Sequence, residues 1–470
     1  MVDRNKELGR NTIILGIGQL FPKLFSLLLL PFLTAYLTTE EYGNYDLILS
    51  IASLLIPVVT LQIQQAVFRY LLSTTQNHER KEYVTGAVIY ILASSCICYP
   101  VVFVCLELYG INTLNSLVIC LLFWSEAVYI LFGQIVRGLG FNAKYSLSVV
   151  VYSLANLGFS VLMLVVLHLG LFGVIISLML GYICANIFML FSSGLLKYFD
   201  LRCFKKPYLK RLLQFSAPIV PSSIALWIVN LSDRLIIIHF LGSAANGIYA
   251  VANKIPSLYS TAYSVFNLAW TETATRVSDD GNPAEYYSKL FRVLFKFLIG
   301  MMLFLIAATP LVFKFLVKGD YGSAIYQVPF LYFGIFFNSL VNFYSGIYIA
   351  LKRTKQVGYS SVLGAALNAI INLILINKIG LYAASISTAV SFFIIVVYRA
   401  FDLNKVIKIK YSFKEIFWGI MCFAIASLCL HVNNIPMIIA CWCIGVAYNL
   451  TQNLDFVKKL LATVLYHRSK

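Results

Sequence analysis

Long apolar stretches separated by short polar loops run through the whole chain. A stretch of about 20 apolar residues is long enough to cross the hydrocarbon core of a bilayer. Fourteen such stretches follow one another, and the last two are short. They fall near residues 12–36, 47–68, 84–106, 114–133, 147–168, 171–195, 215–240, 247–270, 290–317, 325–351, 357–376, 381–401, 416–431 and 434–451. The pattern predicts an all-α polytopic membrane protein with fourteen spans.

Composition excludes a soluble globular protein. Hydrophobic residues make up 60% of the chain, charged residues only 12%, and the mean hydropathy is +0.84, whereas a soluble domain has about 25% charged residues. All ten cysteines except Cys203 fall inside apolar stretches, so we expect no disulfide framework. The five histidines are scattered without a metal-ligand spacing, and we expect neither a metal nor a cofactor.

The positive charges indicate how the chain crosses the membrane. The net charge of +17 would suit a nucleic-acid partner, but nearly all of the 36 Lys and Arg lie in alternate loops between spans. The other set of loops contains only Lys314, Lys318 and Lys378. Cytoplasmic loops of membrane proteins are enriched in Lys and Arg. We therefore expect both termini in the cytoplasm and no nucleic-acid partner.

Two segments repeat at a similar offset. Residues 36–45 (YLTTEEYGNY) match residues 240–249 (FLGSAANGIY) at a leucine, a glycine and a tyrosine, and residues 170–177 match residues 380–387. Chance similarity between apolar helices remains the alternative. A duplication of six helices predicts two six-helix bundles related by a pseudo-two-fold axis along the membrane normal, as in transporters built from parallel repeats.

This duplication also predicts the domain organisation. We expect an N-terminal bundle over residues 1–196, a basic cytoplasmic linker over 197–214, and a C-terminal bundle over 215–404. Residues 405–470 then form two additional helices and a basic cytoplasmic tail.

Asp233 and Arg234 lie next to each other in the seventh apolar stretch. Ionisable side chains inside a bilayer are costly unless they face a partner or a hydrated cavity, which marks them as functional candidates. Arg234 is a candidate for substrate binding, and Asp233 a candidate for ion coupling. The alternative is an ion pair that only joins two helices.

Other ionisable residues within the spans differ in their predicted depth. Lys23 and Glu126 fall near the middle of their spans, and Lys254 falls in the outer half. Lys23 and Lys254 are cavity candidates, and Glu126 is a second candidate for ion coupling. Three residues lie near the predicted cytoplasmic ends of their spans: Arg69, Arg137 and Lys296. We expect them either to line the cytoplasmic entrance of the substrate cavity or to extend their charges to the membrane–water interface.

The eighth apolar stretch contains a polar stripe with a spacing of three or four residues, which places its members on one helix face. Lys254 and Thr261 widen the stripe. Such a face lines either a hydrated cavity or a contact between helices. The stripe consists of Asn253, Ser257, Ser260, Ser264 and Asn267. For the asparagines, including Asn368 and Asn372 of the eleventh stretch, hydrogen bonding between helices is the favoured interpretation.

Three segments resemble the polysaccharide-export or oligosaccharide flippase (Wzx-like) proteins of the MOP superfamily, which also includes the MATE exporters. They are residues 37–45 (LTTEEYGNY), Ser232-Asp233-Arg234 with Leu241-Gly242, and Asn368 to Asn372 with residues 379–384 (IGLYAA). The resemblance covers nearly the whole chain. It implies two six-helix bundles in a bacterial cell membrane and movement of polyprenyl-pyrophosphate-linked glycans from the inner to the outer leaflet.

The resemblance and the charges together favour a flippase that is not an enzyme. More cations than carboxylates within the spans suit an anionic substrate, because guanidinium groups bind phosphate well. The expected partners are the glycan lipid, membrane lipids, and polysaccharide polymerase and chain-length proteins. Two alternatives remain: a MATE-like exporter of small cations, and a membrane-embedded polymerase or acyltransferase. The polymerase or acyltransferase is disfavoured because the predicted outer loops are too short to fold into a catalytic domain.

Overall fold

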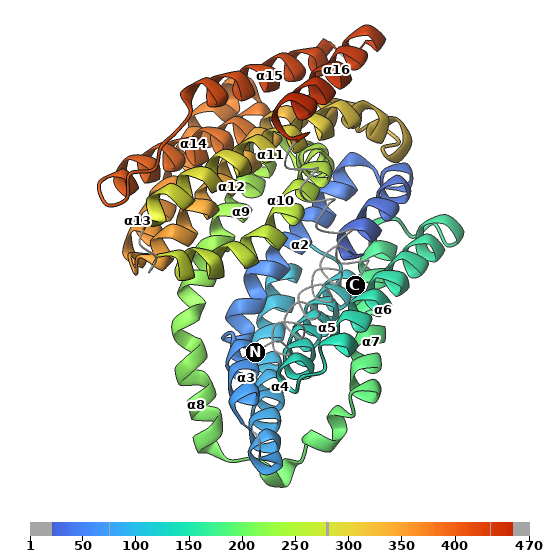
Figure 1. Cartoon of the computed structure of the whole chain (residues 1–470). Helices are drawn as coiled ribbons and strands as arrows, with labels where there is room; N and C mark the ends of the chain where they lie inside the picture. The colour runs from blue at the N-terminus through green and yellow to red at the C-terminus, as the bar shows by residue number, and fades with distance from the viewer. Residues whose placement is uncertain (1–20, 75, 279–281, 433, 455–470) are drawn as a thin grey trace, which may run out of the picture. The chain divides into compact units, whose positions relative to one another are not determined.

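The computed structural model describes residues 21–74, 76–278, 282–432 and 434–454. Within these ranges the regular secondary structure is helical, without a strand (Figure 1). The chain divides into two compact units, Met1–Leu235 and Ile236–Lys470. The boundary between them falls inside helix α9 (Val220–Leu241).

The first helix described in the first unit is an apolar helix over Phe21–Tyr36. Its aliphatic interior is built mainly from α3, α4 and α5, and includes Val67, Ala87 and Val136, none of which is exposed. The helices that follow Phe21–Tyr36 are α2 (Thr39–Thr60), α3 (Ile63–Ser73), α4 (Asn77–Leu108), α5 (Thr113–Gly138), α6 (Asn142–Val161), α7 (Gly170–Ser192) and α8 (Lys206–Ser216).

The second unit has a more aromatic interior. Trp270 stacks on Phe343 with ring centroids 4.6 Å apart, and its Nε1 donates to the Phe343 carbonyl at 2.9 Å. The helices are α10 (Ser243–Val277), α11 (Pro283–Leu316), α12 (Val328–Ala350), α13 (Thr354–Ile379), α14 (Tyr382–Asn404), α15 (Phe413–Val432) and α16 (Ile435–Gln452).

Each predicted apolar stretch overlaps a helix, although residues 12–20 of the first stretch lie outside the described residues. Among the helices of the described residues, eleven are long and apolar enough to cross a membrane. The chain is therefore a multi-pass helical membrane protein. Phe21–Tyr36, α9 and α10 stay predicted spans, and so does the total of fourteen.

The segment between the first two predicted spans is helical from Thr39, where the sequence analysis expected a short outer loop. Thr38 caps α2: its Oγ1 accepts from the Glu41 amide at 3.2 Å, while Glu41 accepts from the Thr38 amide at 2.9 Å. This reciprocal capping box satisfies two of the amides left free at a helix start. Glu41 also accepts from the Leu171 amide at 3.5 Å. A side chain at Gly170, where φ is +52°, would press on Glu41.

The second predicted span, over residues 47–68, is broken into two helices. Leu61 and Gln62 have left-handed backbones with φ of 43° and 56°, and they separate α2 from α3. Non-glycine residues rarely adopt this conformation, so the surroundings must hold it. Gln62 Nε2 donates to Ser223 Oγ at 3.2 Å, which connects the break to the start of α9.

The predicted cytoplasmic linker packs against the first unit. Leu212 of α8 is fully buried, and Tyr208 meets the Tyr83 ring edge-on at 5.0 Å. Lys205 forms an ion pair with Glu82, a carboxylate of α4 that has no exposed surface. A hydrogen bond to Glu82 raises the pKa of Tyr208 to about 12. The linker therefore includes a helix that belongs to the core of this unit.

The last helix, α16, packs on α11 through amide side chains. Asn449 Nδ2 donates to the Gly300 carbonyl at 3.1 Å, and Asn453 Nδ2 donates to the Lys296 carbonyl at 3.1 Å. A Cβ atom at Gly300 would collide with both amides, so glycine allows this close approach. Lys296 Nζ also pairs with Glu415 of α15 at 3.0 Å.

Candidate functional site

Arg234 on α9 forms an ion pair with Asp46 on α2. Its Nε donates to Asp46 Oδ2 at 2.7 Å, and the two side chains are 21% and 16% exposed. Asp46 lies one turn beyond the capping box, and α2 thereby presents a carboxylate to α9. In the sequence, the carboxylate nearest to Arg234 is the adjacent Asp233. The side chains of adjacent residues on a helix point about 100° apart. Asp233 is buried, with 6% of its surface exposed.

Glu126 on α5 is surrounded by tyrosines from neighbouring helices. It forms a side-chain hydrogen bond with Tyr182 of α7. Tyr182 stacks on Tyr152 of α6 with centroids 4.5 Å apart, and Tyr129 lies 5.3 Å from Tyr182. The structure therefore gives this ion-coupling candidate an aromatic and hydroxyl-rich environment.

The polar stripe of α10 is half-buried along its whole length. Its serine hydroxyls donate to carbonyls of their own helix: Ser260 to Ser257 at 2.8 Å, and Ser264 to Thr261 at 2.7 Å. A different face of α10 makes a contact with α11, where the Tyr259 hydroxyl donates to the Leu298 carbonyl. At 100° per residue, Tyr259 lies about 100° from Ser260. Lys254 and Asn253 are half-buried at one end of the stripe, and Asn267 lies at the other.

The other candidate cations have separate surroundings. Lys23 is exposed. The Arg69 guanidinium lies 5.6 Å from the Phe215 ring, and that of Arg137 lies 5.0 Å from the Phe68 ring. Contacts of this kind hold a guanidinium on an aromatic face. With Lys296 paired to Glu415, the three predicted entrance residues each have a local contact, and their role at an entrance stays a prediction.

Arg399 on α14 is a buried cation that the sequence analysis did not single out. It has no exposed surface. Its Nη1 donates to Ser345 Oγ at 2.5 Å, and its Nε donates to Ser360 Oγ at 2.9 Å. Further bonds reach Ser361 Oγ and the carbonyls of Val341 and Val357. Because Arg399 lies near the end of a predicted span, charge counting assigned it to the cytoplasm. The apolar residues on either side of it, Val397 and Phe401, were the sequence feature that could have indicated its burial.

The interpretation of Asn368 as a link between helices is confirmed. Its Nδ2 donates to Thr388 Oγ1 on α14 at 3.0 Å, and its Oδ1 accepts from Ser387 Oγ at 3.3 Å. Asn372, one turn later, has no exposed surface. Among the described residues, no group of three or more His, Cys, Asp or Glu is arranged to hold a metal ion.

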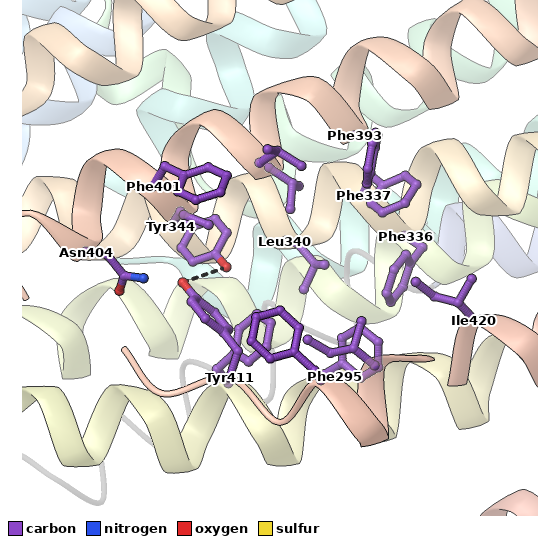
Figure 2. Close-up of a pocket in the computed structure, with 16 residues that line it drawn as sticks. Phe295, Phe336, Phe337, Leu340, Tyr344, Phe393, Phe401, Asn404, Tyr411 and Ile420 are labelled. Carbon is purple, nitrogen blue, oxygen red and sulfur yellow. Dashed lines mark hydrogen bonds between the residues drawn. The ribbon is translucent and has the colours of Figure 1, made fainter. Parts of the chain in front are cut away.

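The second unit contains a cavity of about 320 Å³ lined almost entirely by apolar and aromatic side chains (Figure 2). α11 contributes Phe295, α12 contributes Phe336, and α15 contributes Ile420. One end is polar, because Asn404 lies there and the hydroxyls of Tyr344 and Tyr411 are hydrogen-bonded at 3.2 Å. This cavity was not anticipated from the sequence, because its lining comes from four separate segments.

Comparison with known proteins agrees with the fold. The structure is similar to the lipid II flippase MurJ in an inward closed conformation, with a TM-score of 0.74 and 15% identity over 96% of this chain and 100% of that one. It is also similar to an inward-facing multidrug resistance MATE transporter of the MOP superfamily, with a TM-score of 0.68 and 14% identity over 86% and 95%. A MATE transporter of Vibrio cholerae gives a TM-score of 0.58 at 14% identity, over 86% and 97%.

Sequence comparison identifies the family. An uncharacterized membrane protein of Methanocaldococcus jannaschii is 24% identical over 260 residues, which are 51% of this chain and 60% of that protein. The matched part therefore spans less than two thirds of that relative. A family model described as polysaccharide biosynthesis protein matches residues 8–271, more than half of this chain. The resemblance noted in the sequence motifs is thus confirmed: the chain belongs to the polysaccharide biosynthesis protein family and has the fold of the MOP superfamily transporters.

Proposed function

We propose that this protein is a flippase for polyprenyl-pyrophosphate-linked oligosaccharides. Its cargo would be the repeat unit of an O-antigen, a capsule or an exopolysaccharide, moved from the inner to the outer leaflet by alternating access. The observation that carries the proposal is the half-buried Arg234 of α9, in a chain whose family is polysaccharide biosynthesis. The proposal places both termini in the cytoplasm of a bacterial cell and gives the chain no enzymatic step.

Arg234 is suited to a pyrophosphate because a planar guanidinium binds phosphate oxygens in a bidentate manner. In the absence of substrate its charge needs a counterion, and Asp46 supplies one at 2.7 Å. A pyrophosphate offers more acceptor oxygens than one carboxylate and competes for the same donor. Lys254 on α10, which is half-buried, stays a predicted cavity residue.

The polyprenyl tail requires an apolar surface that is continuous with lipid. The aromatic cavity of the second unit supports such a role. Transfer of hydrocarbon from water to an apolar surface lowers its free energy in proportion to the hydrocarbon area that is buried. Its polar end, at Asn404 and the Tyr344–Tyr411 pair, distinguishes it from a uniformly apolar groove (Figure 2).

Transport of this kind does not require ATP hydrolysis by the chain. Moving one elementary charge through 100 mV is worth about 2.3 kcal/mol. A MATE-like exporter of small organic cations is the alternative, and the observation that favours it is the carboxyl group of Glu126 among aromatic rings. A membrane-embedded polymerase or acyltransferase has no comparable support.

Ligand-dependent stability of the purified protein tests the substrate class. A polyprenyl-pyrophosphate oligosaccharide should raise the melting temperature of the parent protein, and the polyprenyl alcohol should raise it much less, because the alcohol lacks the charged group. Arg234→Gln should reduce the shift, whereas Lys408→Gln, which changes an exposed lysine, should keep it. Stabilisation by organic cations but not by the glycan lipid would favour the exporter and contradict the proposal.

A further inference from the structure

The first unit surrounds one carboxyl group with tyrosines from four helices. Glu126 lies on α5, together with Tyr129. Tyr99 on α4 and Tyr152 on α6 interact electrostatically with the Glu126 carboxyl, and Tyr182 on α7 forms a hydrogen bond with it.

The tyrosines are connected by hydrogen bonds and ring contacts. Tyr182 is hydrogen-bonded to both Glu126 and Tyr152. Tyr152 interacts with Tyr45 of α2, which precedes Asp46, the partner of Arg234. Hydroxyl groups both donate and accept, so a series of this kind can carry a proton. The connections lead from Glu126 towards the helix that carries the counterion of the candidate substrate site.

The close packing that holds this cluster depends on Gly181, the neighbour of Tyr182. A Cβ atom at Gly181 would lie 3.2 Å from Asn156 Cβ and 3.3 Å from Tyr152 Cδ2, tighter than ordinary contacts. Glycine therefore lets α6 and α7 approach closely enough for Tyr152 and Tyr182 to stack. On the α5 side, Asn186 Nδ2 donates to the Ser125 carbonyl at 3.0 Å and keeps α7 against the turn that carries Glu126.

No positive charge balances Glu126 in the part of unit 1 that the structure describes. None of the ion pairs of the described residues includes Glu126. Arg234 is held by Asp46. Arg137, on the same helix, is eleven residues away, about 16 Å along the axis, and lies on aromatic rings. The carboxyl is therefore surrounded by neutral groups.

One oxygen of this carboxyl has no partner. Glu126 Oε2 is buried and takes part in no hydrogen bond with the described residues. An ionised carboxylate needs donors or a counterion at both oxygens, and burying its charge without them is very costly. A neutral acid leaves only one hydroxyl unsatisfied, a cost of about 1–3 kcal/mol. The site therefore favours a bound proton at this position.

We infer that Glu126, with Tyr182, Tyr152, Tyr99 and Tyr129, forms a proton-binding site in the first unit. Its ligand is H⁺, held as the carboxylic acid, and it does not need a metal cation. The use of this proton to drive glycan movement rests on the proposed function, whereas proton binding itself does not. The half-buried rings of Tyr152 and Tyr182 leave part of the cluster accessible.

Infrared difference spectroscopy of the full-length protein in nanodiscs, across a pH titration and without substrate, tests the site. The parent should show a carbonyl band of a protonated carboxylic acid that persists into the neutral range. Glu126→Gln should lose this band, and Glu40→Gln, which alters an exposed carboxylate, should keep it. Tyr182→Phe should shift the band to higher frequency, because the hydrogen bond to the acid is lost, without removing it.

The outcomes separate this inference from the proposed function. A parent spectrum in which Glu126→Gln changes nothing would overturn the proton site, whatever the protein transports. Removal of the band by Na⁺ but not by K⁺ at constant pH would also overturn it, because the ligand would then be a metal cation. If Glu126→Gln does not fold, the carbonyl band of Tyr182→Phe becomes the test of the site. A band at the same frequency as in the parent would contradict the assignment to Glu126. A Glu126 band in a protein that does not transport glycan lipid would support the proton site and contradict the proposed function.

Discussion

The ion pair between Asp46 and Arg234 gives a quantitative prediction. Exposed ion pairs contribute about 0.2–1 kcal/mol, whereas leaving a fully buried charge unpaired costs about 3–5 kcal/mol. With side chains 21% and 16% exposed and an N–O distance of 2.7 Å, this pair lies between these limits. We expect Asp46→Asn and Arg234→Gln each to lower the free energy of unfolding by about 2 kcal/mol.

A double-mutant cycle isolates the pair from other effects of each substitution. The double variant should lose about 2 kcal/mol rather than the sum of about 4, because the second change leaves no further charge unpaired. Chemical unfolding of the purified protein in detergent measures all four stabilities. A coupling energy below about 0.5 kcal/mol would refute the argument, because independent sites add within that margin.

Exchanging the two residues separates stability from substrate binding. Asp46→Arg combined with Arg234→Asp retains one charge of each sign across α2 and α9, so stability should recover in part. Glycan transport should not recover, because the guanidinium then projects from α2 instead of α9. Full transport by the exchanged protein would show that Arg234 has only a structural role.

Three further predictions follow from other parts of the molecule. Ser260→Leu should insert at parental levels yet block glycan transport, because it fills the polar face of α10; loss of the protein from the membrane would instead identify a packing surface. In a cysteine-free background, a single cysteine replacing Glu40 should react with an impermeant thiol reagent added outside, and one replacing Lys405 should not; labelling of the second would reverse the predicted topology. Arg399→Lys should lower the free energy of unfolding by about 2–4 kcal/mol, because three donors replace a guanidinium with five hydrogen bonds; unchanged stability would refute this reasoning.

Helices and family could be predicted from sequence because both depend on features that extend along the chain. Apolar length alone located every helix that the structure describes as long enough to span a membrane. The motif at residues 37–45 pointed to the family, and the structure gives part of it a physical role: Thr38 and Glu41 cap α2, and Glu41 also contacts the start of α7.

Specific partners could not be predicted, because they depend on how distant segments pack. Asp46 lies 188 residues from Arg234, and no local pattern connects them. The left-handed backbone at Leu61 and Gln62 involves residues that are common in continuous helices, so their identity did not predict this conformation. Charge counting likewise assigned Arg399 to the cytoplasm, because the hydroxyls and carbonyls that surround it come from other helices.

Movement of a glycan lipid between leaflets of a reconstituted vesicle tests the central claim most directly. A polyprenyl-pyrophosphate oligosaccharide is placed in both leaflets, and an impermeant glycosidase cleaves what reaches the outside. With the parent protein or Lys408→Gln, cleavage should proceed beyond the outer-leaflet pool towards completion, and with Arg234→Gln it should stop near that pool. Cleavage that ends at the outer-leaflet pool with the correctly folded parent protein would contradict the assignment of this chain as a glycan-lipid flippase.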